Sequence, residues 1–242
     1  MTAVAFSLTL LFTGCVSSQY QAASRDTPTP QVLNVGLVAA PLSVTLDTVI
    51  TFNGPGSWKR DAFWDEYVVS LHNSASQPLT VTAEELTDFN GAPQPAGREP
   101  WALEKRSKSL EQKYHENGVA FVRYTAPGLL IGGTGVVLMA GAGGIAAGAT
   151  AAATVVVLPI YYAVVLTINH HNKVAMEKEF DRRRLGLPLT LTPGETRTGS
   201  FFFPMVPNPR SLGLRWSTGP GSGVNVFPLD FLHGLHIRIK KE

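Results

Sequence analysis

The sequence predicts a mainly β protein, an antiparallel sandwich that is interrupted by an inserted α-helical hairpin. Two observations indicate this fold class. Short segments rich in Val, Ile, Thr and Phe alternate with Gly, Pro and Asn turns up to residue 100 and again from residue 187. Between these two regions, residues 124–169 form a run of 46 residues without Asp, Glu, Lys, Arg or His.

The amino-terminal residues indicate export. Residues 1–14 are uncharged and mostly apolar, as in a signal peptide, and they end at Cys15, the only cysteine. The segment from Phe12 to Cys15 resembles the lipobox of bacterial lipoproteins, in which the cysteine is acylated and becomes the first mature residue. This resemblance implies a lipid anchor at Cys15. Because Val16 follows it rather than Asp, the resemblance also implies the outer membrane, facing the periplasm. The alternative is a buried free thiol at Cys15.

Residues 15–31 are small, polar and contain proline, which is typical of a flexible tether. The single cysteine excludes an internal disulfide. The net charge of +2 is too small to indicate binding to nucleic acid. Composition therefore favours a tethered β domain over a nucleic-acid-binding one.

The first β region is predicted to hold four strands. Residues 32–39 and 42–52 read as two of them, and residues 54–64 read as a turn-rich loop with exposed Trp58 and Trp64. Residues 66–73 and 78–86 alternate around a short polar loop, which predicts a β-hairpin.

The second β region is predicted to add about four strands, which lie within residues 187–193, 199–206, 211–216, 224–231 and 234–241. The run of three phenylalanines at 201–203 is typical of a buried strand. The overall pattern of short strands is similar to that of immunoglobulin-like domains of bacterial envelope proteins. We therefore expect residues 32–100 and 187–242 to form one immunoglobulin-like sandwich.

Residues 101–186 are predicted to form the insertion. Polar helices are expected at 101–117 and 170–184, with a membrane segment at about 119–169 between them. If the flanking strands share one sandwich, the chain must cross the bilayer an even number of times, so we expect a hairpin with its turn at 141–144. The polar helices would continue the hairpin as a stalk. The alternatives are one span with a long apolar loop, or a helical hairpin that is buried in a soluble protein or in an assembled ring.

Small residues recur at intervals of four in this segment, in a pattern called a glycine zipper. Such a stripe lets another helix approach closely. The partner is either the other arm of the hairpin, a second copy or another protein. The predicted packing residues are Gly128, Gly132, Ala140, Gly144, Gly148 and Ala152.

Signals for catalysis or metal binding are weak. His233 and His236 would point to opposite faces of a predicted strand, which argues against a shared metal. Asp61, Asp65 and Glu66 are interpreted as a solvated loop rather than as a catalytic carboxylate pair. No motif for a nucleotide, a zinc ion or a hydrolase nucleophile is present, so no cofactor and no metal are predicted.

Two remaining groups have simple explanations. His170 and His171 are interpreted as a polar cap at the membrane edge, and residues 182–184, three arginines, as a solvated or headgroup-contacting helix end.

The predicted function is that of a non-enzymatic, lipid-anchored component of the cell envelope. It would assemble through its glycine-rich hairpin with further copies or other envelope proteins, and its partners would include membrane lipid but no nucleic acid. A subunit of an oligomeric pore or secretion channel is the first alternative. An envelope enzyme with its site in the β-domain loops is the second.

Overall fold

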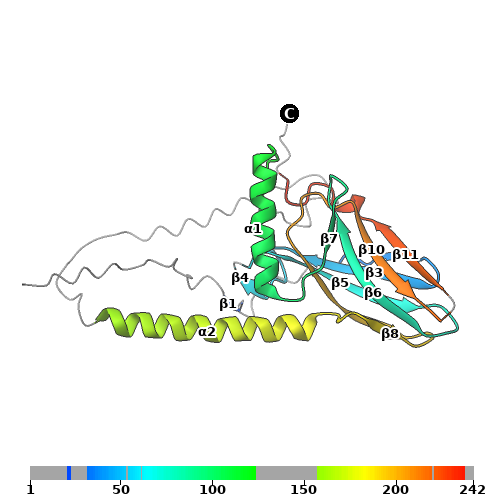
Figure 1. Cartoon of the computed structure of the whole chain (residues 1–242), viewed down its shortest axis with the longest axis horizontal. Helices are drawn as coiled ribbons and strands as arrows, with labels where there is room; N and C mark the ends of the chain where they lie inside the picture. Colours follow the sequence, from blue (N-terminus) through cyan, green and yellow to red (C-terminus); the bar gives the residue numbers. More distant parts are fainter. Residues whose placement is uncertain are drawn as a thin grey trace, which may run out of the picture.

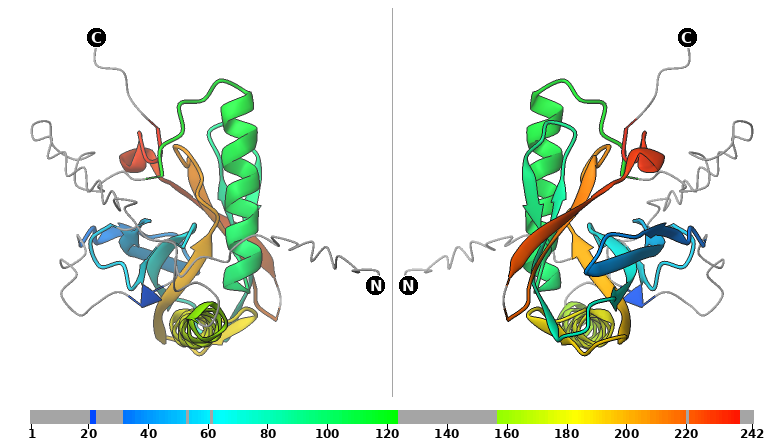
Figure 2. Two further views of the ribbon diagram at one scale, coloured as in Figure 1. Left: turned by 90° about the vertical axis from the view of Figure 1, so that its left-hand side faces the viewer. Right: turned by 90° about the vertical axis from the view of Figure 1, so that its right-hand side faces the viewer.

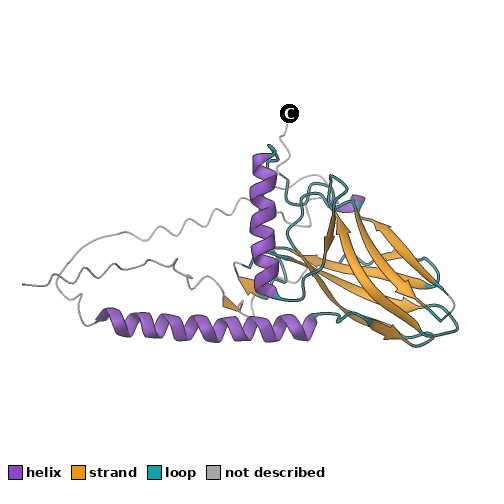
Figure 3. Cartoon of the chain, viewed as in Figure 1, coloured by secondary structure: helices purple, strands orange, loops and turns teal. Residues whose placement is uncertain are grey.

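The computed structural model describes residues 21–22, 32–52, 54–60, 62–123, 157–219 and 221–237. In this part of the chain the protein is mainly β, with antiparallel sheets and two α-helices (Figures 1 and 3). The predicted β class is confirmed at this level.

One sheet has four strands in the order β2 (Val35–Leu37), β3 (Leu42–Ile50), β5 (Asp65–Asn73) and β9 (Thr196–Phe203). The central strands β3 and β5 alternate buried and partly exposed residues, because one face of the sheet covers the core. A separate two-stranded sheet pairs β1 (Gln21–Ala22) with β4 (Lys59–Arg60).

The other large sheet has the order β11 (Ser222–Pro228), β10 (Ser211–Ser217), β6 (Leu79–Thr87) and β7 (Pro93–Pro95). A short strand, β8 (Leu189–Leu191), also pairs with β6. Both large sheets therefore combine strands from before and after the insertion.

The two large sheets share one apolar core. Tyr67 of β5 and Phe203 of β9 pack edge to face, with ring centroids 5.3 Å apart. Leu86 of β6 and Leu214 of β10 meet them from the other sheet. This common core makes the arrangement sandwich-like.

The predicted hairpin of residues 66–73 and 78–86 is wrong, because β5 and β6 belong to different sheets. The turn between them is held by Asn73, whose side-chain amide donates to the carbonyls of Gln77 (2.9 Å) and Leu191 (3.0 Å). Two strands that bury alternate residues in one core show the same sequence pattern whether they pair within one sheet or face each other from two sheets. The pattern therefore could not distinguish these arrangements.

The end of the second β region also differs from the prediction. Residues 233–236 form turns after a short 3-10 helix, η2 (Asp230–Leu232), His236 has a positive φ of 56°, and Ile237 makes only an isolated β-bridge. A left-handed residue interrupts a strand, so the strand predicted at 234–241 is wrong for the residues up to Ile237.

Helix α1 (Pro100–Glu116) matches the predicted helix at 101–117, and Pro100 stands at a position where proline is favoured. Helix α2 (Val157–Arg183) covers most of the predicted polar helix at 170–184 and extends back through apolar residues 157–169, which were also expected to be helical. The two helices run in different directions, as Figure 2 shows with α2 seen end-on beside an upright α1. The expected stalk of two helices side by side is therefore wrong for these helices.

In the part of the chain that the structure describes, neither helix combines the length and the apolar character needed to cross a membrane. Residues 124–156, which contain most of the predicted membrane hairpin, lie outside this part. The hairpin stays a prediction.

Candidate functional site: the helix joint

All of the residues predicted to carry function lie outside the described part of the chain. They are Cys15, the predicted lipidation site, and the predicted packing residues Gly128, Gly132, Ala140, Gly144, Gly148 and Ala152. What the structure does describe is how the two ends of the insertion are attached to the sheets.

We call the first attachment the helix joint, an apolar cluster between α1, α2 and the outer face of the sheet that contains β5 and β9. Phe180 of α2 stacks on Phe202 of β9 with ring centroids 4.0 Å apart. Trp64 packs edge to face against Phe180 at 6.0 Å and against Trp101 of α1 at 6.4 Å. The full cluster is Trp58, Ala62, Trp64, Trp101, Leu103, Met176, Phe180 and Phe202.

The register of the strands explains why the joint forms at this point. Tyr67, Phe201 and Phe203 face the core, so Phe202 and Glu66, which are opposite each other in the β5–β9 ladder, face outward. Both are nevertheless fully buried. An outward apolar ring on a strand is stable only if another element covers it, and α2 does so here.

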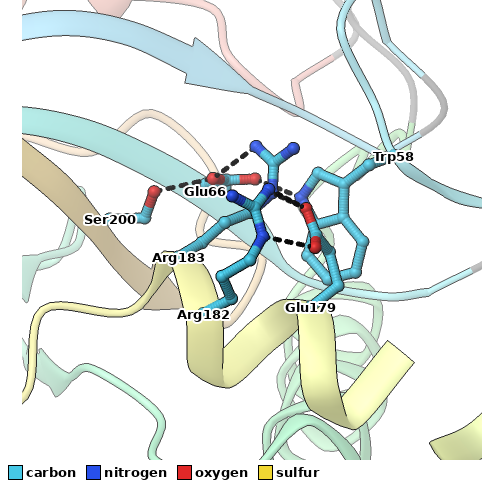
Figure 4. A network of polar contacts seen from close by, with 6 residues as sticks. All are labelled: Trp58, Glu66, Glu179, Arg182, Arg183 and Ser200. Atoms are coloured by element: carbon cyan, nitrogen blue, oxygen red, sulfur yellow. Dashed lines mark hydrogen bonds and ion pairs between the residues drawn. The ribbon is translucent and has the colours of Figure 1, made fainter. Parts of the chain in front are cut away.

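Glu66 is the centre of a polar network at the edge of the joint (Figure 4). Its carboxylate accepts hydrogen bonds from the Trp58 indole at 2.5 Å and from the Ser200 hydroxyl at 2.6 Å. The Arg183 guanidinium lies 3.4 Å from the same carboxylate and 5.3 Å from the centre of the Trp58 ring. A buried carboxylate with these three partners is well satisfied.

On α2 the network continues through Glu179. Arg183 donates to Glu179 at 2.7 Å, and Arg182 donates to it at 2.5 and 2.7 Å. The hydrogen bond from Arg182 is the main cause that lowers the pKa of Glu179 to about 2, with a further contribution from Arg183. The contact of Arg183 with Glu66 thus joins the end of α2 to β5, while Glu179 holds Arg183 in position on the helix.

The second attachment holds the residues that lead into the apolar segment. The ring of His236 lies with one nitrogen, Nε2, 2.7 Å from Asp65 and the other, Nδ1, 3.1 Å from the carbonyl of Val122. The ring also stacks on Phe121, whose backbone pairs with that of Ile237. Residues 121–122, close to the start of the apolar segment, are therefore bound to the carboxy-terminal turns of the β structure.

Several interpretations of polar residues need correction. Asp65 and Glu66 lie on strand β5 and are buried, so the solvated loop predicted for them is wrong. Trp64 is also fully buried and Trp58 is partly buried, although both were expected to be exposed. Asp61 lies outside the described residues.

The arginines at 182–184 differ in their surroundings. Arg182 is largely exposed, as the solvated helix end predicted, but Arg183 is directed into the joint. At the other end of the polar part of α2, His170 and His171 are exposed.

The two buried carboxylates are adjacent on β5 and hence point to opposite faces of the sheet. Asp65 meets His236 on one side, and Glu66 meets Arg183 on the other. This placement does not direct both carboxylates to one substrate bond. Among the described residues, no group of three His, Cys, Asp or Glu side chains could hold a metal ion.

Lys59 of β4 is a third buried charge beside the joint. Its ammonium donates to the carbonyls of Ala62 (3.4 Å) and Trp64 and lies 5.1 Å from the centre of the Trp64 ring. Burial lowers the pKa of Lys59 to about 8, because desolvation of the ammonium outweighs the attraction of the nearby carboxylates. The ammonium is enclosed by carbonyls and has no exposed surface, which fits a structural role.

One signal in the sequence could have revealed the joint. Three consecutive phenylalanines on one strand place apolar rings on both faces, which indicates a strand covered on both sides. That pattern predicts a covering element, although it does not identify α2. Comparisons of the chain with protein-family models, with curated proteins and with solved structures found no match, so the role of the joint rests on its own contacts.

Proposed function

We propose that this protein is a lipid-anchored component of the bacterial cell envelope that acts in structure or assembly. In this proposal Cys15 carries the lipid, residues 15–31 form the tether, and residues 32–100 and 187–242 form an immunoglobulin-like sandwich. Residues 119–169 enter the membrane as a helical hairpin and pack through their small residues with further copies or other envelope proteins.

The observation that carries the proposal is the attachment of both ends of the apolar segment to one pair of sheets. The entry is held by Phe121 and Val122 against His236, and the exit is held by Arg183 against Glu66. Because both attachments are on the same body, a segment that enters a bilayer must return to the side from which it came.

The course of α2 supports the same proposal. The polar end of α2 is fastened in the joint, and the helix then extends away from the sheets toward its apolar beginning (Figure 1). In the part of α2 whose side chains are described, residues 170–183, Met176 and Phe180 are buried in the joint. A helix fixed at one end in this way is suited to hold an apolar segment at a set distance from the β structure.

The test is membrane fractionation of four forms of the full chain expressed in bacteria. They are the parent, Cys15→Ser, a variant in which residues 124–156 are replaced by a short Gly-Ser linker, and the combination of both changes. We expect the parent and each single variant to stay with membranes, because either anchor suffices, and the combined variant to be released. Release of Cys15→Ser alone would contradict insertion of the hairpin.

Assembly is tested in mild detergent. We expect Gly144→Leu and Gly148→Leu to reduce the mass of the oligomer, because leucine at these positions blocks close helix packing. Ile145→Leu, at a position outside the small-residue stripe, is the matched control and should leave the mass unchanged. An unchanged mass in the glycine variants would contradict assembly through this stripe.

A further inference from the structure

Strand β11 forms an edge of its sheet, and its burial pattern alternates strictly. Asn225 and Phe227 are buried, whereas Val224 and Val226 are 53% and 62% exposed. Asn225 is fixed inward, since its amide donates to the carbonyl of Leu42 at 2.8 Å. The outer side of this edge therefore presents two adjacent apolar side chains on a rigid strand.

The backbone of β11 also has bonding capacity on its free side. The amide of Thr218 donates to Gly221 (2.7 Å) at one end of the β10–β11 ladder, and the amide of Leu229 donates to Arg210 (2.8 Å) at the other. Bonded and non-bonded pairs alternate in an antiparallel ladder, so the residues of β11 that bond to β10 are the odd-numbered ones. Val224 and Val226 then direct their N–H and C=O groups away from β10, toward the open edge.

Over residues 222–227 this edge lacks the features that normally prevent pairing, and Pro228 ends the strand. The opposite edge of the same sheet ends in β7, which is short and contains Pro93 and Pro95, two residues without an N–H group. Strand β11 is seven residues long and carries no charged residue. The contrast indicates that one edge is protected and the other is kept available.

We propose that β11 pairs antiparallel with β11 of a second copy, centred on Asn225, to join the two sheets into one. In this register Val224 of each copy lies opposite Val226 of the other, so the four valines form one apolar patch. Each such pair contributes two backbone hydrogen bonds. Since β11 carries no charge, no like charges are placed opposite each other.

The neighbouring strands favour a second copy as the occupant. On the outer face Arg215 lies beside Val224, and Gly213 lies beside Val226. Glu85 leans over Gly213, with its Cγ 3.3 Å from where a Cβ of that glycine would lie. Arg215 is diagonal to Glu85 on this face within each copy, so the two charges offset each other and do not oppose a two-fold pairing across the valines. This surface is complementary to itself.

The proposed pairing of β11 does not depend on the membrane hairpin. It is tested on the full chain in mild detergent with a short thiol crosslinker. A mixture of Val224→Cys and Val226→Cys should give about fivefold more crosslinked dimer than either variant alone, because residues 224 and 226 are directly opposite and identical positions are diagonal. The parent, whose single cysteine is Cys15, is the control. Equal yields from the mixture and the single variants, or crosslinking to a different protein, would overturn the proposal.

A second set of variants tests the interface without crosslinking. Val226→Pro removes an N–H that points to the open edge and should abolish the contact, whereas Val226→Thr keeps the N–H and should retain it. Val226→Lys gives the same test if the proline variant does not fold. Retention of the contact in both Val226→Pro and Val226→Lys would exclude this interface.

The two modes of assembly can be separated in one background. In the Gly144→Leu variant we expect the crosslink between residues 224 and 226 to persist. Its persistence together with a reduced oligomer mass would support both interfaces, and its absence both with and without Gly144→Leu would reject the β11 interface alone.

Discussion

The outer face of strands β5 and β9 has two halves that behave in opposite ways. Toward one end, Phe202 and Glu66 are fully buried beneath α2. Toward the other end, Ser70 and Thr198 form an exposed hydroxyl pair at 2.8 Å, and His72 contacts Thr196 at 3.0 Å. One pair of strands thus provides a binding site for a helix and an ordinary solvated surface.

The boundary between the halves lies where the chain leaves α2 along the edge of β9. There the amide of Leu185 donates to the carbonyl of Ser200 at 2.9 Å. Gly199 faces the core, like Phe201 and Phe203, and a Cβ on it would lie 2.7 Å from the Leu185 side chain. The difference teaches that the helix joint depends on one outward aromatic ring and one buried carboxylate.

The largest effect is expected from removing the outward ring. Phe202→Ala should destabilise the protein by about 4 kcal/mol, because the stacked Phe180 loses its partner and a cavity remains. Thr198→Ala, on the exposed half of the same strand, should change stability by less than about 0.5 kcal/mol. Urea denaturation followed by tryptophan fluorescence measures both. Similar values for the two variants would remove the distinction between the halves.

The second effect concerns the buried carboxylate. Glu66→Gln should cost about 2 kcal/mol, since Arg183 loses its buried counter-charge while the shape of the site is kept. Asp47→Asn is the matched control, because Asp47 accepts from Ser70 at 2.8 Å on the exposed half of this face. It should cost less than about 0.5 kcal/mol in the same denaturation experiment. Equal costs would show that burial by α2 does not strengthen the network.

The local elements of this fold could be predicted from sequence, because their signals are local. The alternation of residues 42–52 predicted β3, and the dense charges of 101–117 predicted α1. The charge boundary at His170 does not interrupt the helix, since α2 continues through it to Val157, as expected if the polar helix continues an apolar helical arm. A change in polarity along a helix marks a change in environment and not an end of hydrogen bonding.

The joint and the second attachment could not be predicted in the same way, because their partners are distant in sequence. Glu66 and Arg183 are 117 residues apart, and Asp65 and His236 are 171 apart. A carboxylate is expected to be solvated unless a partner is known, so Asp65 and Glu66 were placed in a solvated loop. The lipid anchor and the membrane hairpin rest on composition and motif, and they stay predictions.

The third effect tests the charge buried beside the joint. The pKa of Lys59 is about 8 in the folded protein and 10.5 for an ordinary lysine, so above pH 8 the unfolded chain binds more protons. Stability should therefore rise by about 2 kcal/mol from pH 7 to pH 9.5. Denaturation at both pH values measures this, and Lys59→Met should abolish the rise. A rise of the same size in Lys59→Met would assign it to other groups.

The smallest effect is expected at Glu179, which is partly exposed on the rim of the joint. Its pKa of about 2 is below the usual 4.5, so its contribution is present above pH 4.5 and is lost as the pH falls through 2. Because solvent screens this pair, Glu179→Gln should cost only about 0.5 kcal/mol at pH 6. The difference from the parent should persist at pH 4 and disappear near pH 2 in urea denaturation. A cost that stays constant down to pH 2 would mean that Glu179 supports α2 by packing and not through its charge.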